Sequence, residues 1–118
     1  MAERLHRVPS RFVVEHWARA TFPEDDEWIA LVRAPEGLTV VREAPPWAEG
    51  ETWVGFYGGA ERGARRPDSL SALANPLADS GIPVFVASTY HADLVLVPEE
   101  RLTEAAAALR GAGFAISE

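Results

Sequence analysis

The sequence predicts an α+β fold in which two helices cover one face of an antiparallel sheet. Two observations support this class. Short runs of β-branched and aromatic residues alternate with two segments whose apolar residues recur at helical spacing. From residue 52 onward the predicted order is strand, helix, strand, strand, helix, strand. Such a βαββαβ order is typical of the ferredoxin-like arrangement, with both helices on the same side of the sheet.

The first half of the chain is predicted to supply strands without helices. Residues 11–18 (RFVVEHWA) are rich in β-formers and predict a strand. The runs 28–33 and 38–42 flank Ala34-Pro35-Glu36-Gly37, in which proline at the second position and glycine at the fourth favour a type I turn. We therefore expect a hairpin there. The Pro-Pro pair within residues 43–50 marks a connection.

The second half begins with a strand at 52–58, followed by a loop rich in glycine and arginine. Asp68 or Ser69 is expected to cap a helix that ends before Gly81, with Pro76 bending its last turn. The apolar positions of this helix, three and four residues apart, are Leu70, Leu73, Ala74 and Leu77. The helix therefore presents one apolar face.

Two strands follow, at 83–89 and 93–97, and the nearly continuous apolar character of the first favours a central position in the sheet. Pro98 opens a second helix, and the two glutamates after it lie near the positive end of its dipole. Its apolar stripe consists of Leu102, Ala105, Ala106 and Leu109. Residues 114–116 are expected to form a last short strand.

Composition and charge exclude several classes of protein. A chain of 118 residues is the size of one compact domain, and it contains no apolar run near the roughly 20 residues that cross a bilayer. The formal net charge of −7 argues against a nucleic-acid partner, because such proteins neutralise phosphates with Lys and Arg. The chain has no cysteine, so thiolate metal sites and disulfides are excluded. We expect a cytoplasmic protein that binds neither nucleic acid nor membrane.

Three kinds of chemical site have partial signals in the sequence. Arg62, Arg65 and Arg66 lie among glycines, but the loop lacks the lysine and Ser/Thr of a phosphate-binding loop, which leaves a solvated basic loop or an anion contact. His91 and Asp93 form an incomplete metal shell. The chain has no Gly-x-Ser-x-Gly motif and no acid pair placed to flank a bond. We therefore predict no enzyme activity, no metal and no cofactor.

Residues 88–100, STYHADLVLVPEE, resemble a signature of ACT domains in the CASTOR-like group, which includes eukaryotic arginine sensors. The segments 75–78 and 81–85 are similar to the group's helix end and second strand. The resemblance implies two ACT-like halves, a degenerate one at 1–51 and an ACT domain at 52–118. It also implies a regulatory protein that binds a small amino acid between ACT units and has no chemistry of its own.

The same resemblance implies the ligand-binding residues. They lie in the loop that leads into the first helix and in the turn between the two following strands: Arg66, Asp68, Ser69, Leu70, Thr89, Tyr90 and Asp93. In this assignment Asp93 accepts hydrogen bonds from a ligand cation. By itself, a carboxylate at a hairpin turn most often caps a local backbone amide, so both roles stay open for Asp93.

The leading functional prediction is an amino-acid-sensing module that signals through altered association. The alternative is a structural homodimerisation domain without a ligand. Pro67 and Asp68 favour the alternative, because Pro67 removes an amide donor from the loop and Asp68 replaces the glycine usual in the group. In both cases we expect a homodimer, since open sheet edges need covering.

Overall fold

The computed structural model describes residues 3–18, 28–58 and 69–117, with the side chains of residues 28 and 69 outside the description. In chain order the elements of this part are β1 (Glu3–Trp17), β2 (Trp28–Ala34), β3 (Gly37–Glu43), β4 (Trp53–Gly58), α1 (Ser69–Asp79), β5 (Phe85–Ser88), β6 (Asp93–Pro98), the 3₁₀ turn η2 (Glu99–Arg101), α2 (Leu102–Gly111) and β7 (Phe114–Ser117). The predicted α+β class is confirmed. From β4 onward the elements also follow the predicted order.

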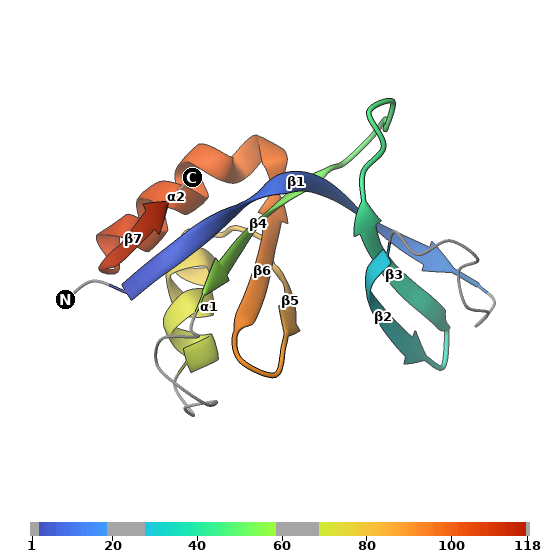
Figure 1. Ribbon diagram of the computed structural model, residues 1–118, viewed down its shortest axis with the longest axis horizontal. Helices are drawn as coiled ribbons and strands as arrows, with labels where there is room; N and C mark the ends of the chain where they lie inside the picture. The colour runs from blue at the N-terminus through green and yellow to red at the C-terminus, as the bar shows by residue number, and fades with distance from the viewer. Residues whose placement is uncertain (1–2, 19–27, 59–68, 118) are drawn as a thin grey trace.

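β1 joins the β2–β3 hairpin to the strands β4, β6 and β5 in one sheet (Figure 1). Its residues 5–12 pair antiparallel with β4, and its residues 12–17 pair antiparallel with β3. Its first residues, 3–6, also pair in parallel with β7. The strand order is β2-β3-β1-β4-β6-β5, with β7 on the free side of β1. A shift of register between Val8 and Arg11 includes Pro9, which has no amide hydrogen to donate.

This position of β1 changes the expected ferredoxin-like arrangement. In an uninterrupted βαββαβ unit the first and last strands are neighbours, whereas here β1 lies between β4 and β7. The predicted first strand, 11–18, is accordingly too short. Residues 3–10 carry many charged and polar side chains, and they become a strand because Leu5 is buried to 1% exposure in the main core. The domain boundary between residues 51 and 52 stays a prediction. β1, which precedes this boundary, pairs with β3 of the predicted first half and with β4 and β7 of the predicted second half.

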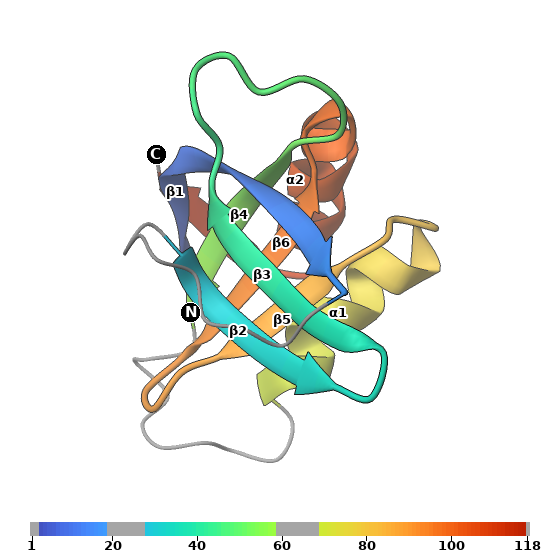
Figure 2. The same ribbon diagram turned by 90° about the vertical axis from the view of Figure 1, so that its right-hand side faces the viewer.

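The main core lies between the sheet and the two helices, which pack on the same face (Figures 1 and 2). Leu73 and Leu77 of α1 and Ala105 and Leu109 of α2 are buried there, as the helical spacing predicts. The rest of the buried cluster consists of Leu5, Val54, Phe56, Ile82, Val95, Val97 and Phe114. Leu70, in the first turn of α1, is 42% exposed, so the apolar stripe is buried only from Leu73 onward.

α1 ends as its sequence predicts. Gly81 has a φ of +71°, its amide donates to the carbonyl of Ala78, and the amide of Ile82 donates to the carbonyl of Leu77. These two bonds form a Schellman motif, which needs a left-handed residue at the glycine position. Ile82 then enters the main core beside Leu77. The end of α1 thereby directs the chain back towards β5.

A second apolar cluster lies on the face of the sheet that the helices do not cover. Its buried members are Phe12 of β1, Val41 of β3 and Leu96 of β6. Ala30 of β2 and Phe85 of β5 pack against the same cluster, although these strands are the two ends of the sheet path. The sheet is therefore curled, in a barrel-like manner, with its two ends turned towards each other on the uncovered face.

The predicted hairpin 28–42 is confirmed as β2 and β3, with Pro35 and Glu36 in its turn. The prediction for 83–89 is wrong in one respect. β5 covers only Phe85–Ser88 and stands at an end of the sheet, pairing with β6 alone among the described strands. Its apolar character instead reflects contacts on both faces, with Val86 against the main core and Phe85 against the second cluster. No helix in the described ranges is long and apolar enough to span a membrane.

Candidate functional site

The turn between β5 and β6 carries three of the predicted site residues. Ser88 and Asp93 are the last paired residues of the two strands. Between them, the Thr89 amide donates to the Ala92 carbonyl over 2.7 Å. The Thr89 hydroxyl also donates to that carbonyl, and its oxygen accepts from the amide of Ala92 at 2.9 Å. The Thr89 side chain is therefore engaged in shaping the turn.

Asp93 is the buried carboxylate of this turn, with 8% of its surface exposed. Its Oδ1 accepts a hydrogen bond from the Ser88 hydroxyl over 2.7 Å. An ionised carboxylate has about four acceptor positions, so this bond leaves capacity for a further donor. Sequence reasoning did not select Ser88, although a serine cross-strand from an aspartate at the base of a hairpin is a recognisable signal.

Tyr90 and Leu70 both reach solvent. Tyr90 is 82% exposed, and its ring makes an edge contact with His91 at a centroid distance of 4.8 Å. At such an exposed ring a cation–π contact contributes about 0.5–1 kcal/mol, and more when the contact is desolvated. Arg66 and Asp68 lie outside the described residues, as does the side chain of Ser69.

The two predicted site segments lie at the same end of the molecule. Gly58, the last residue of β4, is the pairing partner of Asp93, so the chain leaves the sheet next to that carboxylate on its way to α1. The start of α1 and the β5–β6 turn both point downward in Figures 1 and 2. The fold thus brings the end of β4, the first turn of α1 and the β5–β6 turn to one end.

A polar cluster that the sequence analysis did not identify lies at the other end of β6. Glu99 Oε1 accepts from the Thr52 hydroxyl over 2.6 Å and from Arg11 Nε over 3.0 Å. These two hydrogen bonds hold the pKa of the Glu99 carboxyl below its ordinary value of 4.5, with Thr52 the larger cause. Next to it is an open cavity of about 500 Å³, lined by Gly50, Glu51, Thr52, Pro98, Glu99 and Glu100.

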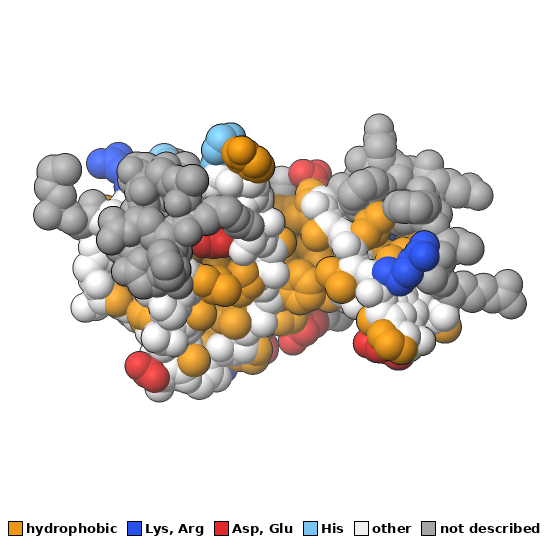
Figure 3. Space-filling model, turned by 90° about the horizontal axis from the view of Figure 1, so that it is seen from below, with side chains coloured by type: hydrophobic (Ala, Val, Ile, Leu, Met, Phe, Trp, Pro, Cys, Tyr) orange, Lys and Arg blue, Asp and Glu red, His pale blue; other side chains and the backbone are white. Residues whose placement is uncertain are grey.

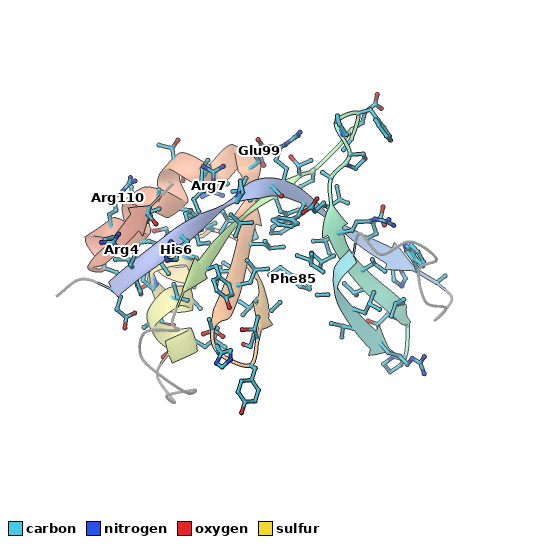
Figure 4. All side chains as sticks on the ribbon, in the orientation of Figure 1. Arg4, His6, Arg7, Phe85, Glu99 and Arg110 are labelled. Carbon is cyan, nitrogen blue, oxygen red and sulfur yellow. The ribbon has the colours of Figure 1, made fainter. Side chains whose placement is uncertain are left out.

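A smaller cavity of about 190 Å³ lies between α2 and β1. Two arginines line it, Arg7 from β1 and Arg110 from the last turn of α2 (Figure 4). The other lining side chains are Phe56, Leu102, Thr103, Ala106 and Ile116. Neither cavity contains a predicted site residue. Within the described part of the chain, no group of three or more His, Asp or Glu is placed to hold a metal ion.

Residues 59–111 match the family model of the ACT domain. This match supports an ACT domain-containing protein. It covers somewhat less than half of the chain and runs from the end of β4 to the end of α2. ACT domains are commonly regulatory modules that bind amino acids, and they are not catalytic. No curated protein matches the chain.

Solved structures share the fold, among them the following two. Protein Atu0741 from Agobacterium tumefaciens superimposes with a TM-score of 0.82 at 20% identity, covering 99% of this chain and 93% of its own. VC0802 from Vibrio cholerae, described as a protein of unknown function and possible transport protein, superimposes with a TM-score of 0.71 at 25% identity. That alignment covers 89% of this chain and 85% of the other. These superpositions show a shared fold over 99% and 89% of this chain.

Proposed function

We propose that this chain is a cytoplasmic, non-enzymatic ACT module of the CASTOR-like group that binds a small amino acid between ACT units. The ligand changes how those units associate. It can do so only by binding one assembly state more tightly than the other.

The observation that carries the proposal is the position of Asp93. It lies on β6, inside the segment that matches the ACT domain, at the end of the sheet where β4 leads into α1. A buried carboxylate with spare acceptor capacity suits the ammonium or guanidinium group of an amino acid, and such a charge-assisted bond contributes about 1.5–3 kcal/mol.

The first turn of α1 is suited to bind the carboxylate group of the amino acid. Free amides at a helix N-terminus, together with the helix dipole, favour a carboxylate. The first turn of α1 itself contains no acidic residue, and Asp68, a predicted cap, directly precedes it outside the described residues. An amino acid whose ammonium group faces Asp93 and whose carboxylate faces the start of α1 would use both features.

One observation favours the second candidate, a homodimerisation domain without a ligand. Ser88 already donates to Asp93, and Thr89 is engaged in the turn. If the chain binds no ligand, the only role of these polar groups is to stabilise the β5–β6 hairpin.

A calorimetric and thermal-shift screen of the proteinogenic amino acids separates the two candidates. A ligand present at one hundred times its Kd stabilises the folded protein by about 2.7 kcal/mol. The sensor proposal expects at least one amino acid to raise Tm. If none does so at millimolar concentration, the domain without a ligand is favoured.

The variant Asp93→Asn then tests the role of the carboxylate. It preserves the size of the side chain and an acceptor for Ser88, but it removes the charge. We expect it to weaken a cationic or zwitterionic ligand at least tenfold. Val84→Asn, an exposed change outside the predicted ligand-binding residues, serves as the control for nonspecific effects. Unchanged affinity in Asp93→Asn would contradict the assignment.

A further inference from the structure

Two arginines line the cavity between α2 and β1. They are Arg7 and Arg110, and among the described residues no carboxylate lines the cavity with them. On the face of the molecule shown in Figure 3, few Lys and Arg side chains are in view among the described residues. Figure 4 shows that Arg7, like Arg4 and His6, comes from β1, whereas Arg110 comes from α2. In a chain of net charge −7, the cavity is therefore a local site of positive charge.

Arg7 lies on the helix-covered face of the sheet. It pairs with Phe56 and follows Leu5 by two residues, so side-chain alternation places it on the same face as that buried leucine. Its Nε is buried. An arginine beside a core is unusual, and it keeps its charge there. Because a guanidinium has five N–H donors in a planar fork, Arg7 can bind an anion in addition to the interactions that it makes within the chain.

Two carboxylates near the start of α2 bond mainly with other residues. Glu104 accepts two hydrogen bonds from Arg101, at 2.9 and 3.0 Å. The pKa of Glu99 is lowered, with the Thr52 hydroxyl as the largest cause and Arg7 as a smaller one. Neither glutamate lines the cavity. These carboxylates therefore do not occupy it.

The dipole of α2 accounts for only one of the two arginines. A basic residue in the last turn of a helix is stabilised by the negative end of the dipole, which is a sufficient reason for Arg110. The dipole gives no reason for Arg7, which belongs to a strand and lines the same cavity. The convergence of two guanidinium groups from different elements is what indicates a ligand.

The rest of the lining indicates an anion that carries a carbon chain. Phe56, Leu102, Ala106 and Ile116 are apolar, and Thr103 contributes one hydroxyl. Each CH₂ group that is buried against such walls raises affinity by about fourfold. Inorganic phosphate has no apolar part and gains nothing from these walls. A carboxylate group, in contrast, fits the planar fork of an arginine and can be attached to an apolar chain.

The volume of the cavity limits the size of the ligand. One water occupies about 30 Å³ in the liquid, so the cavity of about 190 Å³ corresponds to about six waters. A carboxylate with about four to six carbon atoms suits this space, whereas a nucleotide is too large. Thr103 and Arg110 are exposed, so the ligand can enter from solvent.

We propose that the cavity between α2 and β1 binds a short-chain organic carboxylate. Arg7 and Arg110 bind the carboxylate group, and the apolar walls surround the chain. This site goes beyond the proposed amino-acid site, since none of the predicted ligand-binding residues lines the cavity. The ligand needs no ammonium group, because no acidic side chain among the described residues lines the cavity to pair with one.

The test is an NMR chemical-shift titration of the isotope-labelled full chain with hexanoate, acetate, hexan-1-ol and inorganic phosphate. Hexanoate should bind in the millimolar range or more tightly, and it should shift the amides of α2 and β7 but not those of residues 88–93. Acetate tests the role of the chain, and hexan-1-ol tests the role of the charge. Acetate, hexan-1-ol and phosphate should each bind at least about tenfold more weakly than hexanoate.

Variants of the two arginines and of one wall residue locate the site. Arg110→Gln removes an exposed charge and should weaken hexanoate binding at least about fivefold, and Arg7→Gln at least about tenfold. Arg33→Gln, an exposed arginine on β2 outside the cavity, is the matched control and should stay within about twofold of wild type. Ala106→Leu fills the apolar part and should reduce the advantage of hexanoate over acetate to below about threefold. A circular dichroism melt checks that each variant is folded, and Arg110→Gln carries the test if Arg7→Gln is not.

Glu118 directly follows β7 and lies outside the described residues, so Glu118→Gln is titrated beside wild type. Each of four results would overturn the proposal: no binding of hexanoate by either form, shifts confined to residues 88–93, equal affinity for hexanoate and any of the other three probes, or unchanged affinity in Arg110→Gln. The amino-acid screen is read separately, because an amino acid at the proposed site should shift the amides of residues 88–93. Either proposal can therefore fail without the other.

Discussion

Thr52 and Glu99 are joined by two hydrogen bonds. The Thr52 hydroxyl donates to Glu99 Oε1 over 2.6 Å, and the Glu99 amide donates to the Thr52 carbonyl over 2.9 Å. Arg11 adds an ion pair to the same oxygen at 3.0 Å. The residue before β4, the middle of β1 and the first residue of η2 are thereby held together. This cluster fixes the end of the sheet from which α2 departs.

Replacing Glu99 with glutamine should change how stability depends on pH. The pKa of Glu99 lies below its ordinary value in the folded state, so the ionised group stabilises the fold above about pH 4.5. That contribution is lost as the pH falls through the folded-state pKa. The side chain is 41% exposed, so solvent screening limits the effect to about 1 kcal/mol or less. Urea unfolding should show a larger difference between variant and wild type at pH 7 than at pH 3.

Glu100→Gln is the matched control for this measurement. It removes the same charge from an exposed neighbour that makes none of the hydrogen bonds of Glu99. Its stability profile should follow that of wild type across the pH range. Parallel profiles for Glu99→Gln and wild type would show that the cluster contributes nothing to folding.

Gly37→Ala should destabilise the β2–β3 hairpin. Gly37 has a φ of +137°, a conformation that side chains with a Cβ rarely adopt, and an added Cβ would collide with the backbone carbonyl oxygen of Trp17. We expect a loss of about 1–3 kcal/mol in the free energy of unfolding. Gly111→Ala, where a Cβ meets nothing within 4 Å, should change stability by less than about 0.5 kcal/mol. Equal midpoints for the two variants in urea would contradict this explanation.

Ser88→Ala separates the structural and binding roles of Asp93. The change removes the donor to a carboxylate that is 8% exposed, and leaving such a group unsatisfied costs about 1–3 kcal/mol. Thermal unfolding should therefore show a lower Tm. Because Ser88 is not assigned to the ligand, amino-acid affinity should stay within threefold of wild type. A loss of affinity equal to that in Asp93→Asn would mean that Ser88 orients the carboxylate for binding.

The elements with local signals were predictable from the sequence. Helical spacing placed Leu73 and Leu77 on the buried face of α1, and Gly81 marked its end. The Pro-Glu turn and its flanking β-formers gave the β2–β3 hairpin. In each case the residues that determine the element lie within a few positions of one another, so no tertiary contact is needed to recognise the pattern.

The elements that depend on distant contacts were not predictable in the same way. Residues 3–10 form a strand because β4 and β7 lie on either side of them, although their own composition is a poor strand signal. The end position of β5 likewise follows from a distant contact, the pairing of β6 with β4 on its other side. At the candidate site, the buried state of Asp93 and its bond to Ser88 follow from the β5–β6 register, which no single residue specifies.

The position of β1 leads to a last prediction about the fragment 52–118. Without β1, the strands β4 and β7 lose their shared partner, and Leu5 no longer fills the core between them. Deleting one buried leucine side chain already costs about 2–5 kcal/mol, and here a whole central strand is removed. The fragment should lack a cooperative melt and dispersed amide resonances. A peptide of residues 1–17 should restore both, whereas the same peptide carrying Leu5→Asp should not. A fragment that melts cooperatively by itself would show instead that the boundary at residue 52 is a true domain boundary.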